Sequence, residues 1–413
     1  MLQIDHVYRF LFQNLFKDFD LWHCKNGVVN TEDNITFDDF NIFNASKPSR
    51  FKILFYDQEP IIPQITDQYI RVFDWQNYFS PRQLIEKSIL SNMSSKQLLF
   101  NIRNPSVVFQ NEIIVTSEYS DDVSKIINSP CENYFLSLYY FFHGFAALDW
   151  YRGFYALNYK KSVVKPYGKD YISFNRLVHA DRSYRIYFIS KLVEKNIIDH
   201  GHISFDVARD TAPTWQIELN KKKSKLSKKA RAHINQHLKN YHEQLSIDGD
   251  SIPGSASADI PNQVHDSFWH VVTETVFYYD KLHLTEKIFK PIVSKQPFML
   301  LAAPGNLAYL KSYGFKTFDS VIDESYDDIQ DPDQRIDAVV DQLNWYCNLT
   351  DAEKLDIAEK LEPIIEHNFH HFYGEFRHII TRELLDNCQT LFKEIGYDDG
   401  DIDYADIYRV LTA

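Results

Sequence analysis

Between residues 285 and 318 the chain alternates predicted helices with short apolar runs. In chain order we expect a helix, a strand, a helix and a strand at residues 285–294, 297–302, 306–313 and 315–318. The turn after the first strand contains Pro304 and Gly305, and Gly314 is placed to end the second helix. Alternation of this kind is typical of βαβ units, so the sequence predicts a doubly wound parallel sheet.

The N-terminal half contains two further strand signals. Apolar runs at residues 51–56 (FKILFY) and 112–116 (EIIVT) predict strands, and Ser117 is placed to begin a polar helix. Residues 132–155 are rich in aromatic side chains, and they predict a buried helix followed by a connection.

Residues 165–168 read Lys-Pro-Tyr-Gly, which is typical of a connection between domains. Beyond it we expect a strand, a helix and a strand at residues 171–174, 181–196 and 201–207, and then a basic helix of about 20 residues. The predicted organisation is an α/β domain, a second α/β domain and a helical tail at residues 1–165, 166–372 and 373–413.

The bulk composition limits the class of protein. A length of 413 residues is enough for two domains of roughly 100–200 residues each, and 44% hydrophobic residues can form a sizeable core. No apolar window is long enough to span a membrane, and the first residues lack the pattern of a signal peptide. We therefore expect a two-domain protein without a membrane span.

The four cysteines are far apart and form no Cys-x-x-Cys pair; they are Cys24, Cys131, Cys347 and Cys388. This spacing predicts neither a zinc knuckle nor a disulfide framework, and it favours a reducing, cytoplasmic setting. The formal net charge is −13, from 44 basic and 57 acidic residues, which disfavours general attraction to nucleic acid.

The most specific local signal is Thr285-Glu286-Lys287 at the start of a predicted helix. Thr285 is placed to cap that helix, where unpaired main-chain N–H groups and the helix dipole favour an anion such as a diphosphate. Lys287 adds a cation for the phosphates, and the Glu286 carboxylate can accept two hydrogen bonds from a ribose diol. The alternative interpretation is an ordinary capped helix with a surface Glu–Lys pair.

The segment around this signal, residues 268–328, resembles the C-terminal domain of α1,3-fucosyltransferase-like enzymes and their phage and bacterial relatives. The resemblance implies a GT-B architecture, in which two Rossmann-like α/β domains face each other across a cleft. It also implies that Glu286 and Lys287 bind the nucleotide beside Thr285, and Glu274 joins them as a donor-binding candidate.

Two positions depart from the family pattern. His283 stands where the family has an aromatic residue two positions before the threonine, and Pro291 should shorten or kink the helix.

The resemblance extends to an arginine-bearing helix start after the first strand of the nucleotide domain. Arg182 and Arg185 occupy that place, and Arg176 lies just before them. A guanidinium group suits bidentate phosphate binding, so these arginines are candidates for contact with the diphosphate. A salt-bridged helix start is the alternative.

A third likeness concerns the acidic loop that supplies a general base in the family's N-terminal domain. Residues 55–60 read FYDQEP at the end of a predicted strand. A carboxylate in that place can accept the proton of an acceptor hydroxyl. Glu59 is the first candidate and Asp57 the second, and an acidic turn before Pro60 is the alternative.

These likenesses predict a nucleotide-sugar-dependent glycosyltransferase, with a UDP- or GDP-sugar held mainly by the second domain and the acceptor by the first. Tyr278 and Ser294 occupy the partner positions of the Glu-x7-Glu pair found in many retaining enzymes, so we expect inversion. Lys287 and the arginines can neutralise the leaving diphosphate, so we expect neither a metal ion nor a cofactor.

Two other functions stay open. A GT-A-type, metal-dependent transferase would need an Asp-x-Asp motif, and residues 248–250 and 399–401 have that spacing in polar surroundings. A non-catalytic protein that binds a sugar or nucleotide would keep the fold. The C-terminal histidines His367, His370 and His371 are explained better by helix packing than by metal binding.

One basic segment bears on the acceptor. Its cations fall within residues 221–231 of this acidic chain, at Lys221, Lys222, Lys223, Lys225, Lys228, Lys229 and Arg231. Contact with a phosphate backbone would make the acceptor a hydroxymethylated base in phage DNA, flipped toward Glu59. A glycan acceptor needs no basic strip, and the segment is then a solvated helix face. Both acceptors stay open.

Overall fold

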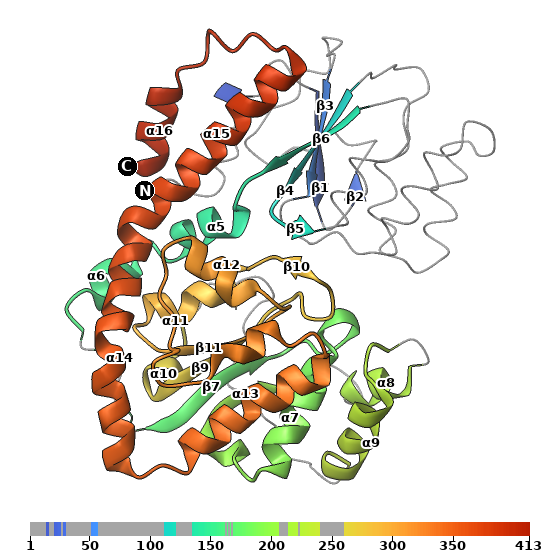
Figure 1. The fold of residues 1–413 in the computed structure, drawn as a ribbon, viewed down its shortest axis with the longest axis vertical. Helices are drawn as coiled ribbons and strands as arrows, with labels where there is room; N and C mark the ends of the chain where they lie inside the picture. The colour runs from blue at the N-terminus through green and yellow to red at the C-terminus, as the bar shows by residue number, and fades with distance from the viewer. Residues whose placement is uncertain are drawn as a thin grey trace. The chain divides into compact units, whose positions relative to one another are not determined.

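The computed structural model describes residues 14–15, 20–25, 28–29, 51–56, 111–120, 134–161, 163, 166, 168–205, 214–221, 224–239 and 260–413. The chain forms two compact units, which are shown in Figure 1. Unit 1 comprises Met1–Asp149 together with Arg377–Ala413, and unit 2 comprises Trp150–Phe376. The predicted domain connection at residues 165–168 lies within the range of unit 2.

Unit 1 contains a sheet with the strand order β2-β1-β3-β4-β6. In that order the strands are Val28–Val29, Asp20–Lys25, Phe51–Tyr56, Asn111–Thr116 and Tyr134–Tyr139. β1, β3, β4 and β6 run parallel, whereas β2 pairs antiparallel with β1. The strands predicted at residues 51–56 and 112–116 are confirmed as the neighbours β3 and β4.

The C-terminal helices belong to unit 1. α15 (Arg377–Ile395) packs on β6, and α16 (Tyr404–Thr412) packs on α15. At the end of β6, Asn387 Nδ2 donates a hydrogen bond to the Tyr139 carbonyl at 2.9 Å. The predicted helical tail is therefore helical, and it is part of a packed unit.

Two predictions for unit 1 are wrong. Residues 134–139 form strand β6, although we expected the segment to begin as a buried helix; α5 (Phe142–Trp150) follows only later. Periodicity alone cannot separate a short buried strand from a buried helix. Ser117 does not begin a helix either, because the short strand β5 (Tyr119–Ser120) follows it. The remainder of that predicted helix lies outside the described residues.

Unit 2 contains a four-stranded sheet with the order β11-β9-β7-β8. In that order the strands are Phe298–Leu301, Ser267–Thr273, Lys169–Asn175 and Gly201–Phe205, and all neighbours are parallel. From β7 the chain passes through α7 (Tyr184–Glu194) to β8, while β9 lies on the other side of β7. The winding therefore reverses between β7 and β9, which makes this pair the topological switch point.

β9 is buried along its whole length, although its sequence includes a histidine. The fully buried Trp269 packs edge-on against Phe318 and Tyr346, with ring centroids 5.7 and 5.9 Å away. Burial, assisted by the charge of Lys290, lowers the pKa of His270 to about 3, so this ring is neutral in the core. β9 was not among the predicted strands because His270 interrupts its apolar run.

The helices of unit 2 form two packed groups around this sheet (Figure 1). α7 packs against α9 (Lys228–His237) and α13 (Pro332–Cys347), and α11 (Phe289–Val293) packs against α6 (Phe154–Asn158) and α14 (Asp351–His371). Unit 2 also contains α8 (Thr214–Asn220), α10 (Asn262–His265) and α12 (Asn306–Ser312).

The capping box predicted at Thr350 is confirmed at the start of α14. Gly314 follows α12 with a φ of +91°, as expected for a glycine that ends a helix. Among the described residues, no helix is long and apolar enough to cross a membrane.

Residues 315–318 were predicted as a strand, but they pair with no strand. Side chains, in place of a neighbouring strand, form hydrogen bonds with main-chain groups of this segment. Asn368 accepts from the Lys316 N–H and donates to the Lys316 carbonyl, both at 2.8 Å, and the Glu324 carboxylate accepts from the Phe318 N–H at 2.6 Å.

The basic helix is shorter than predicted, because α9 begins only at Lys228. Its cap is Ser227, whose Oγ accepts from the Ala230 N–H at 2.9 Å. Arg231 donates to the Leu219 carbonyl near the end of α8 and to the Lys221 and Leu226 carbonyls of the connection that follows. Its guanidinium therefore holds that connection folded against α9.

Candidate functional site

The candidate site lies at the carboxyl ends of β7 and β9, which is where ligands bind in open parallel α/β sheets. Residues 176–183 leave β7 through a 3₁₀ turn, Ala180–Arg182, and enter α7. Residues 274–285 leave β9 and enter a second 3₁₀ turn, Glu286–Ile288, which continues into α11. The topology thus brings two helix starts to the switch-point edge.

The Arg185 guanidinium is buried and joins the ends of the two strands. Its Nη2 donates to the carbonyls of Thr273 and Glu274 at 2.6 and 3.3 Å, and its Nη1 donates to the Leu177 carbonyl at 3.0 Å. Tyr184 adds a hydrogen bond from its hydroxyl to the Glu274 carbonyl at 2.7 Å. Arg185 therefore contributes positive charge from within the edge, with its Nη groups committed to the main chain.

The carboxylate of Glu274 is fully buried and holds the Thr285 turn. Its Oε1 accepts from the Thr285 N–H at 3.1 Å, and its Oε2 accepts from the Thr285 hydroxyl at 2.5 Å and the Thr275 N–H at 3.3 Å. A buried carboxylate needs such donors to offset the loss of water. Glu274, predicted to bind the donor, is thus placed to position the residues that follow Thr285.

Thr285 caps the turn as predicted, with the Lys287 N–H 3.5 Å from its Oγ1. The Lys287 ammonium donates to Thr285 Oγ1 at 3.0 Å and to Glu286 Oε1 at 2.9 Å. The Glu286 side chain is 7% exposed, whereas that of Lys287 is 34% exposed. The cation therefore reaches solvent at the helix start while it remains paired with the buried carboxylate.

Further basic side chains follow β7 at the same edge. Arg176 and Arg182 are partly exposed. His179 is exposed as a residue, but partial burial of its ring lowers its pKa from 6.5, and the charges of Arg182 and Lys221 lower it further. The charges of Arg182 and Lys221 therefore act on His179 at this edge.

The connection after β7 is held in a specific conformation. Ala180 has a φ of +53°, a left-handed conformation that costs roughly 1–2 kcal/mol in a residue with a Cβ atom. Two tyrosines from the β9 connection support it. Tyr279 donates to Asp181 Oδ1 at 2.9 Å, and the hydroxyls of Tyr278 and Ser183 lie 3.0 Å apart.

Part of the basic segment packs against the connection that follows β9. Lys225 Nζ lies 4.7 Å from the centroid of the Tyr279 ring, a cation–π contact, and Lys221 donates to Glu218 at 2.6 Å. Lys228 is exposed on α9, and Lys229 is paired with Asp337 at 3.0 Å. Lys222 and Lys223 lie outside the described residues. The segment therefore divides between the switch-point edge and α9.

The start of α12 also follows a strand of this sheet, but a carboxylate of the protein itself already binds the N–H groups there. The Asp327 carboxylate accepts from the N–H groups of Leu307 and Ala308 at 3.0–3.1 Å. This contrast favours the edge of β7 and β9, where cations cluster, as the place for an external anion.

Glu59 and Asp57 lie outside the described residues, as do residues 248–250. Asp399 lies in a turn before α16, where it accepts from the Tyr404 hydroxyl at 2.6 Å. His367 and His371 lie 3.1 and 2.7 Å from the carbonyls of Gly314 and Tyr313, respectively. These contacts fit the packing role that we predicted for the α14 histidines.

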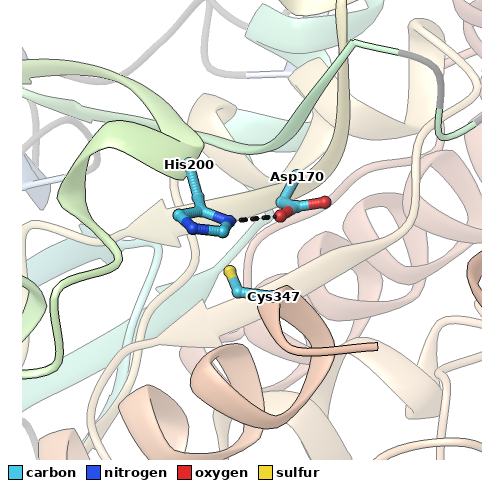
Figure 2. Close-up of side chains that lie close together, drawn as sticks. All are labelled: Asp170, His200 and Cys347. Carbon is cyan, nitrogen blue, oxygen red and sulfur yellow. Dashed lines mark hydrogen bonds and ion pairs between the residues drawn. The ribbon is translucent and has the colours of Figure 1, made fainter. Parts of the chain in front are cut away.

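Figure 2 shows another polar cluster, near the amino end of β7. His200 Nδ1 lies 2.8 Å from Asp170 Oδ2, with the Cys347 thiol close to both. The Lys354 ammonium donates to the other Asp170 oxygen at 2.6 Å, and burial raises the pKa of Cys347 well above its usual range. An ammonium and a protonated thiol beside the carboxylate suit a buried ion pair better than a metal ion.

Comparisons with known proteins found no relative. A scan against protein-family models, a search of curated proteins and a search of solved structures each returned no match.

Replacing Glu274 with Gln tests whether its carboxylate positions the Thr285 turn. In the variant, an NH2 group would face N–H and hydroxyl donors from which the Glu274 carboxylate accepts hydrogen bonds. The free energy of unfolding should therefore fall by about 1–3 kcal/mol. Urea denaturation measures the change, with Asp280→Asn as a control because Asp280 is exposed in the same connection. Equal stability of the two variants would contradict the assignment.

Proposed function

We propose that the switch-point edge of unit 2 binds the nucleoside diphosphate part of a nucleotide sugar, and that the protein transfers the sugar to an acceptor hydroxyl. The observation that carries this proposal is the convergence at one edge of two helix starts with Arg176, Arg182 and Lys287. Helix starts and cations together favour a phosphate-bearing ligand.

The side chains at the Thr285 turn suit different parts of such a ligand. Lys287 is the partly exposed cation of the turn and would contact the diphosphate. Glu286 would exchange its ion pair with Lys287 for hydrogen bonds from the ribose hydroxyls. Arg182 would contact the diphosphate from the other helix start, while Arg185 would add charge from within the edge.

We propose a GT-B arrangement, in which unit 1 is the acceptor side and supplies the general base. Glu59 is the first candidate for that base and Asp57 the second. The base removes the proton of the acceptor hydroxyl while the hydroxyl oxygen bonds to the anomeric carbon of the sugar. At the same time the bond between the anomeric carbon and the diphosphate oxygen breaks, and the electron pair leaves with the nucleoside diphosphate. This single displacement inverts the anomeric configuration, and the cations neutralise the leaving group without a metal ion or cofactor.

The competing hypotheses make different use of this edge. A GT-A-type transferase would hold the diphosphate through a metal bound by an Asp-x-Asp motif, and Asp399 is instead engaged by Tyr404. A non-catalytic sugar- or nucleotide-binding protein would bind the same ligand without turnover. Measuring release of free sugar or transfer to an acceptor separates the second hypothesis from the proposed enzyme.

Arg182→Ala and Lys287→Ala should each weaken binding of UDP or GDP, because each removes a cation from the proposed diphosphate site. The loss should be about 1.5–3 kcal/mol for a largely desolvated contact. Isothermal titration calorimetry measures it, and Lys360→Ala is the control because Lys360 is an exposed cation on α14. Unchanged affinity in both test variants, with the control also unchanged, would remove the proposed donor site.

Nucleotide affinity should rise as the pH falls from about 8 to 6. Burial, Arg182 and Lys221 depress the pKa of free His179, and a bound diphosphate would offset the two positive charges and raise it again. Binding would then take up a proton. The His179→Gln variant removes this contribution but keeps the titration of the nucleotide itself, so calorimetry should show a weaker pH dependence. The same pH dependence in both proteins would contradict the placement of His179.

The acceptor is either a hydroxymethylated DNA base or a glycan. The described part of the basic segment presents Lys228 and Lys229 on α9, away from the cation–π contact of Lys225 with Tyr279. A DNA backbone would contact the α9 cations, whereas a glycan would not require them.

The Lys228→Gln/Lys229→Gln variant separates these acceptors. If the acceptor is DNA, its binding should weaken, and the slope against log salt should fall by about 0.9 for each phosphate that the variant no longer neutralises. Hydrolysis of the donor without acceptor should be unchanged. Filter binding at several salt concentrations is the measurement, and absence of salt-dependent DNA binding by the unaltered protein would exclude the DNA acceptor.

A further inference from the structure

A histidine pair and a carboxylate meet where α9 packs on the end of α7. His233 and His237 are one helical turn apart on α9, and their rings are stacked with centroids 4.4 Å apart. Glu194 is the last residue of α7. One potential ligand atom from each of the three residues lies within 4.8 Å of the other two.

Hydrogen bonds fix the tautomer of a neutral His233 ring. The Ser190 hydroxyl donates to the Tyr187 carbonyl at 2.7 Å, so its proton is already used. His233 Nδ1 lies 3.0 Å from the same Ser190 oxygen and must therefore be the donor in that contact. This leaves the lone pair of a neutral ring on Nε2.

The Nε2 lone pair faces another acceptor. Nε2 is buried without a hydrogen-bond partner, although Glu194 Oε2 lies only 3.2 Å away. Two acceptors at this distance are stabilised by a cation between them, and imidazole nitrogen with carboxylate oxygen is a common ligand set for zinc.

We propose that Glu194, His233 and His237 form a binding site for a divalent transition-metal ion of the zinc type. Tetrahedral ligands at zinc bond lengths of about 2.0–2.1 Å lie about 3.3 Å apart, and the His233–Glu194 separation of 3.2 Å matches this. Three protein ligands leave one coordination position for water.

An internal cation competes for this site. The Lys191 ammonium forms an ion pair with Glu194 and also lies 3.5 Å from Asp337 Oδ1. A metal ion would displace Lys191 from Glu194, and Asp337 would retain it. Asp337 also accepts hydrogen bonds from Lys229 of α9 and from the Tyr187 hydroxyl of α7, both at 3.0 Å. It therefore already binds donors from both helices.

In the part of the chain that the structure describes, the other histidine clusters do not place two hydrogen-bond acceptors against each other. His367 and His371 each have a ring nitrogen against a main-chain carbonyl, and Asp170 already faces the Lys354 ammonium. The proposed metal site is also separate from the donor site. α7 begins at the switch-point edge with Tyr184 and reaches Glu194 ten residues later, about 15 Å along the helix. A bound ion would join α7 to α9 and would take no part in the transfer reaction.

Zinc titration of the metal-free full-length protein tests this site. Isothermal titration calorimetry should show one zinc ion per chain with micromolar affinity, and zinc should raise the melting temperature. His233→Gln and His237→Gln should each weaken zinc binding at least tenfold, while Lys191→Met should tighten it by removing the competing cation. The matched control is His367→Gln/His370→Gln, which removes two histidines from α14 and should leave the affinity unchanged.

Glu194→Gln provides a second test if a histidine variant is poorly folded, as judged by circular dichroism. Zinc binding that is equally strong in the His233, His237 and Glu194 variants would place the metal elsewhere and overturn the proposal. Absence of saturable binding in both the unaltered protein and Lys191→Met would also overturn it. Nucleotide titrations of the same proteins report on the donor site separately, so the failure of one proposal is distinguishable from the failure of the other.

Discussion

The carboxylate of Glu274 is fully buried at the end of β9, where it accepts hydrogen bonds from the N–H and hydroxyl groups of Thr285. A carboxylate without water is tolerated only when donors surround it, so the strand end and the following turn depend on each other. Arg185 fixes the same strand end from α7, through the carbonyls of Thr273 and Glu274. Glu286 and Lys287 therefore take their positions from a buried network, and the two helix starts share one edge of the sheet.

Buried and exposed charges have different functions at this edge. The Glu274 carboxylate holds the Thr285 turn and Arg185 binds main-chain carbonyls, whereas Arg182 and Lys287 keep contact with solvent. A site built in this way keeps its geometry without a ligand and still has cations available to one. α7 extends from this edge to the histidine cluster on α9, so a metal ion there would stabilise the element that carries Arg185 without touching the nucleotide.

The parts of the fold with strong local signals were predictable. The strand at residues 51–56, the cap at Thr285 and the capping box at Thr350 each have a sequence signal within a few neighbouring residues. The predictions fail where contacts between residues far apart in the sequence determine the structure. Residues 315–318 have a strand-like pattern, but their main chain forms hydrogen bonds with side chains of α14 and of a 3₁₀ turn. Arg231 belongs to a run typical of anion binding, yet nearby carbonyls use its guanidinium, and only tertiary structure places the basic segment beside the β9 connection.

Hydrogen exchange measured by mass spectrometry, with and without a saturating nucleotide sugar, tests most directly whether the switch-point edge is the donor site. Exchange should slow in the two connections that leave β7 and β9, at residues 176–186 and 274–290. The long helix α14 provides an internal reference and should be unchanged. Protection confined to other parts of the chain, or no protection at a concentration that saturates binding, would contradict the account.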